Sequence, residues 1–179
     1  FRSIARSIIH AIRSAKKNPG SMTLEDLANY KALKRTPVCG PYRDKLVCGM
    51  GPPSSGGVAI LQILGLLNQF DLGSMEPASL DAVHLISEAS ALAFADRNTY
   101  LADSDFIQVP TEGLVNTEYL KSRANLINLH QNSGRRQAGT PPIIESINLV
   151  PGDHIEGEST THLSVLDSRG NAVAMTSSI

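Results

Sequence analysis

The chain has 179 residues, 41% of them hydrophobic, which fits one ordinary globular domain with a real core or part of a larger domain. Its formal net charge of -1 gives no electrostatic reason to expect a nucleic acid or an anionic membrane as partner. The longest unbroken run of hydrophobic side chains, "ALAFA" at residues 91–95, is far too short to span a bilayer.

The first 30 residues predict two helices. The stretch "FRSIARSIIHAIRSAKK" is basic and amphipathic, and the breaker "NPG" follows it at residues 18–20. It has no initiator Met, no continuous apolar run and no small-residue cleavage site, so we expect a helix inside a longer protein rather than a transit peptide. Thr23 is expected to cap a short second helix through Tyr30, with Asp26 near the first-turn amides. The apolar residues of the first helix share one face: Phe1, Ile4, Ala5, Ile8, Ile12 and Ala15.

Two short strands, over Val38–Gly40 and Lys45–Met50, are predicted to pair through "PYRD". If residues 43 and 44 form the turn, residue 42 pairs with 45 and Cys39 faces Cys48. A cross-strand disulfide is then geometrically possible. General burial preference favours two small buried thiols instead.

Three further helices follow the breaker cluster "GPPSSGG" at residues 51–57. The Gly pair at 56 and 57 lacks the Lys of a phosphate-binding loop, which favours a tight helix entry over an anion site. Residues 130–158 show no period and predict a long loop. The expected helices cover "VAILQILGLLNQF" with Ile60, Leu61, Leu64 and Leu67; Leu80–Tyr100 with Val83, Ile86, Ala89, Leu92, Ala93 and Asp96 at helical spacing; and Thr117–Leu129.

The chain closes with a predicted hairpin, "THLSVLD", the turn "SRGN" at 168–171, and "AVAMTSSI". With that turn, residue 167 pairs with 172 and Thr161 with Ser178. Ser178 is then on the strand beside Thr160, within one register slip of contact. His162 lies two residues from Thr160, on the same side of the strand.

Other kinds of site find little support. The five histidines show no HxxxH spacing and the two cysteines no CxxC spacing, so no metal site is expected. The stretch "DSDF" at 103–106 lacks the Gly and closing Glu of a calcium loop. The stretch "GESTT" at 157–161 has Thr where a serine-hydrolase elbow needs Gly, and a strand follows where the elbow needs a helix.

A Thr at the junction of a loop and a strand allows a different chemistry. A Thr hydroxyl needs a base beside it to act as a nucleophile. If the bond before Thr160 breaks, its new α-amine, with a reference pKa of about 7.7–8.0, lies close enough to be that base. The same hydroxyl can break the bond by attacking the Ser159 carbonyl, after which water hydrolyses the ester. The pattern by itself more often marks a plain strand entry.

Three stretches together resemble the γ-glutamyltranspeptidase (glutathione hydrolase) family: "MTLEDLANYKALKRTPVCGPYRDKLVCGMGPPSSGGVAILQIL", "EASALAFADRNTYLADSDFIQVP" and "STTHLSVLDSRGNAVAMTSSI". The resemblance implies an α+β chain, part of a four-layer αββα fold of the N-terminal-nucleophile hydrolase type. It implies a precursor cut between Ser159 and Thr160, with residues 1–159 from the large-subunit region and 160–179 from the start of the small subunit. Thr160 matches the catalytic Thr, and Ser178 a hydroxyl that hydrogen-bonds the nucleophile, a position usually occupied by Thr. Thr161 and His162 are candidate supporting residues, although a packed structural role is the commoner one for such a His.

The resemblance also implies an activity and its partners. The donor would be glutathione or another γ-glutamyl amide, and the acceptor an amino acid, a dipeptide or water, with no metal or organic cofactor. The two cleaved halves of one precursor would stay together, in the periplasm, outside the cell or on its outer face. The family's carboxylate-binding Arg and oxyanion-hole residues have no counterpart here, so we expect a fragment that is inactive alone. A cephalosporin (glutaryl) acylase and a non-catalytic scaffold remain alternatives.

Overall fold

The computed structural model describes residues 2–142 and 160–178, and the chain divides into two compact units, Phe1–Thr36 and Pro37–Ile179. The first unit holds α1, Arg2–Arg13, and α2, Leu24–Asn29. Thr23 caps α2 as predicted, because its hydroxyl accepts from Asp26 N at 3.2 Å while Asp26 Oδ2 accepts from Thr23 N at 2.8 Å. The hydrogen bonds from the Thr23 side chain and backbone lower the pKa of Asp26.

The expected apolar face of α1 is only partly correct. Ile4 and Ile8 are exposed, whereas Ala5, Ile9 and Ile12 are half-buried. The half-buried residues follow the i, i+4, i+7 spacing of one helical face, which keeps Ala5 and Ile12 from the expected face and includes Ile9 instead of Ile4 and Ile8.

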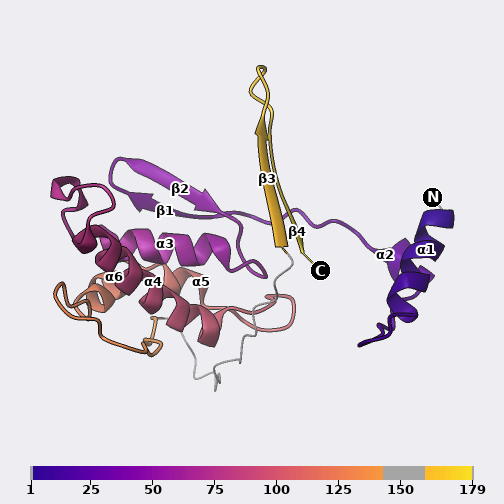
Figure 1. Cartoon of the computed structure of the whole chain (residues 1–179), viewed down its shortest axis with the longest axis horizontal. Coiled ribbons are helices and arrows are strands. Elements are labelled where there is room, and N and C mark those ends of the chain that lie inside the picture. The colour runs from indigo at the N-terminus through magenta and orange to yellow at the C-terminus, as the bar shows by residue number, and fades with distance from the viewer. Residues whose placement is uncertain (1, 143–159, 179) are drawn as a thin grey trace. The chain divides into compact units, whose positions relative to one another are not determined.

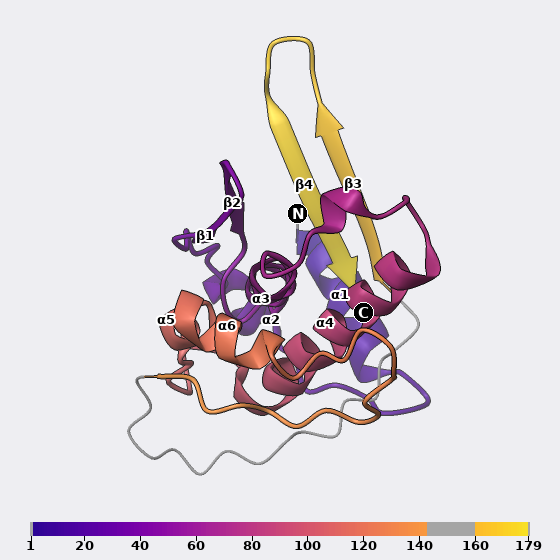
Figure 2. The same ribbon diagram turned by 90° about the vertical axis from the view of Figure 1, so that its left-hand side faces the viewer.

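The second unit contains the other elements of the described chain (Figure 1). Figure 2, in which α3 is seen end-on, shows the β1–β2 hairpin on one side of α3 and the helices α4 and α6 on the other. The bounds are β1 Val38–Tyr42, β2 Lys45–Gly49, α3 Gly56–Leu67, the 3-10 turn η1 Leu72–Ser74, α4 Leu80–Tyr100, α5 Thr111–Leu114, α6 Thr117–Ala124, β3 Thr160–Leu166 and β4 Ala172–Ser178.

The β1–β2 hairpin has the predicted register, and its two cysteines form a disulfide. Our preference for buried free thiols was wrong. Gly40 and Val47 are half-buried and the hairpin packs on α3, so strand alternation turns Cys39 and Cys48 to the exposed face. Their Cα atoms are 4.1 Å apart, close to the spacing of a non-hydrogen-bonded antiparallel pair.

The entry into α3 depends on close backbone approach. A Cβ on Gly57 would lie 2.7 Å from the carbonyl carbon of Gly49 and would collide with Met50 O. The carboxyl end of β2 and the first turn of α3 therefore touch backbone to backbone, which only glycine permits. The tight-entry role predicted for the Gly pair is confirmed at Gly57.

The core lies where α3, α4 and α6 meet. It is formed by Leu66, Leu67, Leu85, Ala89, Leu92, Tyr119, Leu120, Ala124 and Ile127. Ser79 and Asn116 cap α4 and α6 through their side-chain oxygens. The expected face of α4 is partly wrong, since Val83 and Ile86 are exposed and Ala82, Leu85 and Glu88 are buried instead. Asp96, which we expected on this face, is buried.

Two boundaries differ from the prediction. The single turn α5 was not predicted, and α6 ends at Ala124 rather than Leu129. Beyond Ala124 the chain makes i→i−3 bonds, from Leu126 N to Arg123 O and from Ile127 N to Ala124 O, both at 3.0 Å. Leu126 O accepts from Arg136 at 3.1 Å, and Asn128 O is 2.7 Å from His84 Nε2. The end of α6 thus tightens into i→i−3 bonding, and side chains from distant segments bind the carbonyls that follow it.

Candidate functional site

The β3–β4 hairpin places Thr160 directly opposite Ser178. Thr160 is the first residue of β3, and the Cα partners run from this pair to Leu166 with Ala172. The predicted register, which paired Thr161 with Ser178, was wrong by one residue. The correction puts Ser178 opposite Thr160 itself rather than beside it.

The turn explains the slip, because Asp167 belongs to the loop instead of the strand. Its Oδ1 accepts from Arg169 N and Asn171 N, both at 2.9 Å, and its Oδ2 accepts from Asn171 Nδ2 at 2.7 Å. Gly170 completes the loop with a φ of 84°, a conformation that glycine adopts without strain. The hydrogen bonds from Asn171, side chain first, lower the pKa of Asp167. An aspartate that caps its own turn thus shortens the strand by one residue.

His162 is held in the same hairpin by two hydroxyls. Its Nδ1 is 2.7 Å from Thr176 Oγ1 and its Nε2 is 3.1 Å from Ser164 Oγ. A neutral imidazole has one donor and one acceptor nitrogen, and hydroxyls serve either, so both bonds form in either tautomer. Strand alternation puts Thr160, His162 and Ser164 on one face of β3.

The opposite face of this hairpin is apolar. Thr161, which we proposed as a supporting residue, falls on that face by alternation, together with Leu163, Val165, Val173 and Met175. The structure therefore brings Thr160, His162 and the backbone of Ser178 to one end and one face of the hairpin. Ser159, the residue before the predicted cut, lies outside the described residues.

Sequence reasoning missed a buried polar cluster around Asp96, which is 2% exposed. Its Oδ2 accepts from Tyr119 Oη at 2.7 Å and Gln62 Nε2 at 2.9 Å, and its Oδ1 accepts from Gly139 N at 2.9 Å and Arg123 at 3.3 Å. Burial, followed by the hydrogen bond to Asp96, raises the pKa of Tyr119. An acid inside the apolar stripe of α4 was the available signal, because a buried carboxylate requires partners.

A second buried carboxylate, Glu88, lies two turns earlier on the same helix and is 3% exposed. It forms an ion pair with Arg136, and Ser133 N donates to its Oε1 at 3.4 Å. Burial works to raise the pKa of Glu88, but the hydrogen bonds from Arg136 and Ser133 outweigh burial and hold this pKa below its ordinary value. Residues 133–139 of the predicted loop are therefore tied to α4 at two points.

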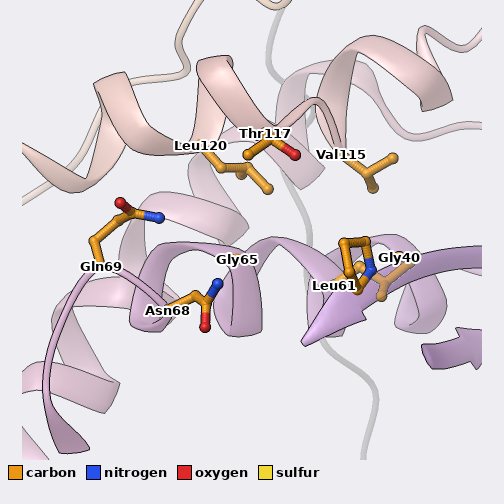
Figure 3. Close-up of a pocket in the computed structure, with 9 residues that line it drawn as sticks. Gly40, Leu61, Gly65, Asn68, Gln69, Val115, Thr117 and Leu120 are labelled. Carbon is orange, nitrogen blue, oxygen red and sulfur yellow. The ribbon is translucent and has the colours of Figure 1, made fainter. Parts of the chain in front are cut away.

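A cavity of about 50 Å³ lies between β1, α3 and α6, where Leu120 faces Gly65 (Figure 3). It has room for about one or two water molecules, and Thr160 does not line it. Within residues 2–142 and 160–178, no cluster of three His, Cys, Asp or Glu could hold a metal ion. In the same ranges, no helix is long and apolar enough to cross a membrane.

Comparison with known proteins places this chain in a family. The sequence profile "Gamma-glutamyltranspeptidase" matches residues 2–179. A "Glutathione hydrolase proenzyme" of Escherichia coli (strain K12) is 44% identical over 161 residues, which are 90% of this chain and 26% of that protein. An "Acylase ACY 1 proenzyme" of Pseudomonas sp. (strain SE83) is 39% identical over 162 residues, 90% of this chain and 27% of that protein. The chain thus spans about a quarter of the length of these relatives.

Solved structures are similar as well. The gamma-glutamyltranspeptidase of Helicobacter pylori superposes with a TM-score of 0.71 at 35% identity, covering 81% of this chain and 41% of that chain. A cephalosporin acylase from Bacillus halodurans superposes with a TM-score of 0.59 at 28% identity, covering 70% of this chain and 22% of that chain. The mixed helix and strand content agrees with the predicted α+β class. The chain belongs to the gamma-glutamyltranspeptidase family.

Proposed function

We propose that this chain belongs to an enzyme that transfers and hydrolyses γ-glutamyl groups, with Thr160 as its nucleophile. The observation that carries the proposal is the position of Thr160, the first residue of β3 and the Cα partner of Ser178, in a chain of this family. The donor is glutathione or another γ-glutamyl amide, and the acceptor is water, an amino acid or a dipeptide. The chemistry requires no metal or organic cofactor.

The first step of the proposed mechanism is self-cleavage. Thr160 Oγ attacks the Ser159 carbonyl carbon, the acyl group moves from nitrogen to oxygen, and water hydrolyses the ester. The products are a carboxylate on Ser159 and a free α-amine on Thr160. Residues 1–159 then belong to the large subunit and 160–179 to the start of the small one, held together as parts of a four-layer αββα core. The name "proenzyme" of the relatives supports a processed precursor.

Turnover uses the same hydroxyl. The α-amine of Thr160 takes the hydroxyl proton, and Oγ attacks the γ-glutamyl carbonyl to give an acyl-enzyme, while the leaving amine departs with a proton. Water or an amine acceptor then releases the γ-glutamyl group. Ser178 supplies a hydroxyl to the nucleophile, and His162, fixed by Thr176 and Ser164, steadies the same face. The segment alone is inactive, and the complete enzyme acts in the periplasm or outside the cell, where the Cys39–Cys48 disulfide is stable.

A second candidate function is cephalosporin (glutaryl) acylase activity. The Pseudomonas acylase and the Bacillus halodurans cephalosporin acylase both favour it, because each matches most of this chain. Both reactions use an acyl-enzyme on the same Thr, so the substrate pocket decides between them. A non-catalytic scaffold is a third candidate. The presence of a hydroxyl residue at both Thr160 and Ser178 argues against it.

The full-length gene product and its Thr160→Ala variant test these candidates. We expect the wild type to yield a chain that begins with Thr160, shown by mass spectrometry, and to hydrolyse γ-glutamyl-p-nitroanilide, whereas the variant stays uncut and inactive. Thr160→Ser, which keeps the hydroxyl, should still be cut. Cleavage with activity on a glutaryl amide alone would favour the acylase. An uncut wild type would favour the scaffold, and turnover by an uncut chain would refute the Thr160 mechanism.

A further inference from the structure

The Cys39–Cys48 disulfide lies on the side of the β1–β2 hairpin that faces away from α3. Both cysteines are exposed, whereas Gly40 and Val47, the next Cα pair of the ladder, are half-buried. Successive side chains of a strand point to opposite faces, and α3 packs against the hairpin on the half-buried face. The disulfide therefore lies outside the packing between the hairpin and α3.

The contacts that hold the hairpin on α3 come from glycines on its other face. A Cβ on Gly40 would lie 3.2 Å from Leu61 Cδ2, and a Cβ on Gly49 would lie 2.6 Å from Gly57 Cα. Leu61 belongs to the buried part of α3 and is 4% exposed. These contacts stay in place when the bond between the two sulfur atoms opens, so opening that bond does not require the protein to unfold.

Both sulfur atoms can be approached from an edge of the sheet. A thiolate attacks a disulfide in line, from the side of the attacked sulfur that is opposite to the leaving sulfur. Because the bond joins β1 to β2, the thiolate reaches Cys39 from the outer edge of β1 and Cys48 from the outer edge of β2. In the part of the chain that the structure describes, this sheet consists of β1 and β2 alone. No further strand of that part lies in either line of approach.

The charge at the tip of the hairpin suits an anionic thiol. Arg43 and Lys45 are cations, and Asp44 between them pairs with Lys45 at 2.6 Å. The guanidinium carbon of Arg43 lies 5.4 Å from the ring centroid of Tyr42. Two cations and one acid leave the hairpin with a net positive charge. Such a charge attracts an anion such as glutathione, which has two carboxylates and one ammonium group, and stabilises a departing cysteine thiolate.

We propose that the Cys39–Cys48 bond is a modification site for small thiols of the glutathione class. The thiolate attacks the sulfur of one cysteine and forms a mixed disulfide with it, and the other cysteine leaves as a thiolate that takes a proton from the solvent. A second thiolate then attacks the sulfur of the attached thiol and frees the modified cysteine. The two small thiols leave joined by a disulfide, and they lose the two electrons that the protein disulfide gains.

This exchange requires only a small thiol and is independent of Thr160, so it goes beyond the proposed function. The proposed donor, glutathione, is itself such a thiol, and its hydrolysis releases another, Cys-Gly. An enzyme that acts on glutathione therefore meets the modifying thiol both as its substrate and as its product. Disulfides persist outside the cell, where the Cys39–Cys48 bond opens only when these thiols are supplied.

The test uses the full-length gene product with Thr160→Ala, which cannot consume glutathione by the proposed reaction. The folded protein is incubated with glutathione, iodoacetamide traps the freed thiols at intervals, and mass spectrometry locates alkylated and glutathione-bound cysteines. The same measurement in urea gives the rate for the unfolded chain. The folded protein should exchange within about tenfold of the rate in urea, whereas a covered disulfide waits for unfolding and exchanges at least about a thousandfold more slowly.

Two further measurements do not depend on that variant. Wild type is treated with mercaptoethanesulfonate, an anionic thiol without a γ-glutamyl amide, and should show the same ratio of folded to unfolded rates. Cys48→Ser leaves Cys39 without a second cysteine that could displace an attached thiol. Oxidised glutathione should therefore modify Cys39 completely in the folded variant, and should do the same at Cys48 in Cys39→Ser.

The modified protein should stay folded, with a far-UV circular dichroism spectrum that overlays the spectrum of the oxidised protein. Exchange that is a thousandfold slower in the folded protein than in urea would overturn the inference, because the disulfide would then be covered in the whole protein. Loss of the folded structure on exchange, or no glutathione on either single-cysteine variant, would overturn it as well. None of these results bears on the γ-glutamyl reaction, which fails separately if no chain beginning at Thr160 is found.

Discussion

At the scale of single residues, the pairing of Thr160 with Ser178 makes a prediction about one hydroxyl. Ser178→Ala should lower kcat for γ-glutamyl amide hydrolysis by about 10- to 100-fold, the rate equivalent of a lost hydrogen bond of about 1.5–3 kcal/mol to the reacting group. Ser178→Thr should retain activity. The matched control is Ser177→Ala, since Ser177 pairs with Thr161 and falls on the other face by alternation. Equal losses in Ser177→Ala and Ser178→Ala would contradict the assignment of Ser178.

Some residues could be predicted from the sequence and others could not. Thr160, Ser178 and His162 stand in a hairpin whose alternation is visible in the sequence, so they could be placed to within one residue. Glu88 and Asp96 could not be assigned partners, because those partners come from residues 23 to 48 positions away in the chain. Helical spacing puts Asp96 on the expected face of α4, but only the fold shows that Glu88 is buried and which groups bind the two acids.

At the scale of elements, the junction of β2 and α3 gives a prediction about one methyl group. Gly57→Ala should destabilise the protein by about 1–3 kcal/mol, because its Cβ would displace the backbone of Gly49 and Met50. Gly56→Ala is the control. Its nearest neighbour, Ser54 Oγ, is 3.8 Å away, so it should be neutral or stabilising by up to about 1 kcal/mol through helix propensity. Urea unfolding of both variants measures the difference, and similar midpoints would contradict the close approach.

Element boundaries followed the sequence where local signals set them. The capping box at Thr23 and the cap at Ser79 begin their helices where predicted, because the capping contacts lie within one turn. The end of α6 could not be predicted, since Arg136 and His84 from distant segments bind the carbonyls of Leu126 and Asn128, which lie just beyond it. The register slip at Asp167 is an intermediate case, because its turn bonds are local but compete with one more strand pair.

At the scale of the whole molecule, irregular chain is ordered by a few strong polar contacts instead of by its own secondary structure. Residues 133–142 have no helix or strand, yet buried acids on α4 bind them, much as the Cys39–Cys48 bond ties β1 to β2. Such buried ion pairs cost much of their attraction in desolvation, so their main effect is to select one chain path. Periodicity can show an acid inside an apolar stripe, as at Asp96, but it does not show which distant segment the acid binds.

The Glu88 pair makes the stability of the whole molecule depend on pH. The pKa of Glu88 in the folded protein lies below its ordinary value of 4.5. The stabilisation by the ionised pair is therefore complete above about pH 4.5 and is lost as the pH falls through the folded pKa. Glu88→Gln should therefore lower the free energy of unfolding by up to about 3 kcal/mol at pH 7, and by less at a pH well below 4.5. Glu118→Gln, which removes an exposed ion pair with Lys121, should lower the free energy of unfolding by less than about 1 kcal/mol at both pH values. Urea unfolding at the two pH values measures these differences, and a gap between wild type and Glu88→Gln that does not shrink in acid would refute the role of the ionised pair.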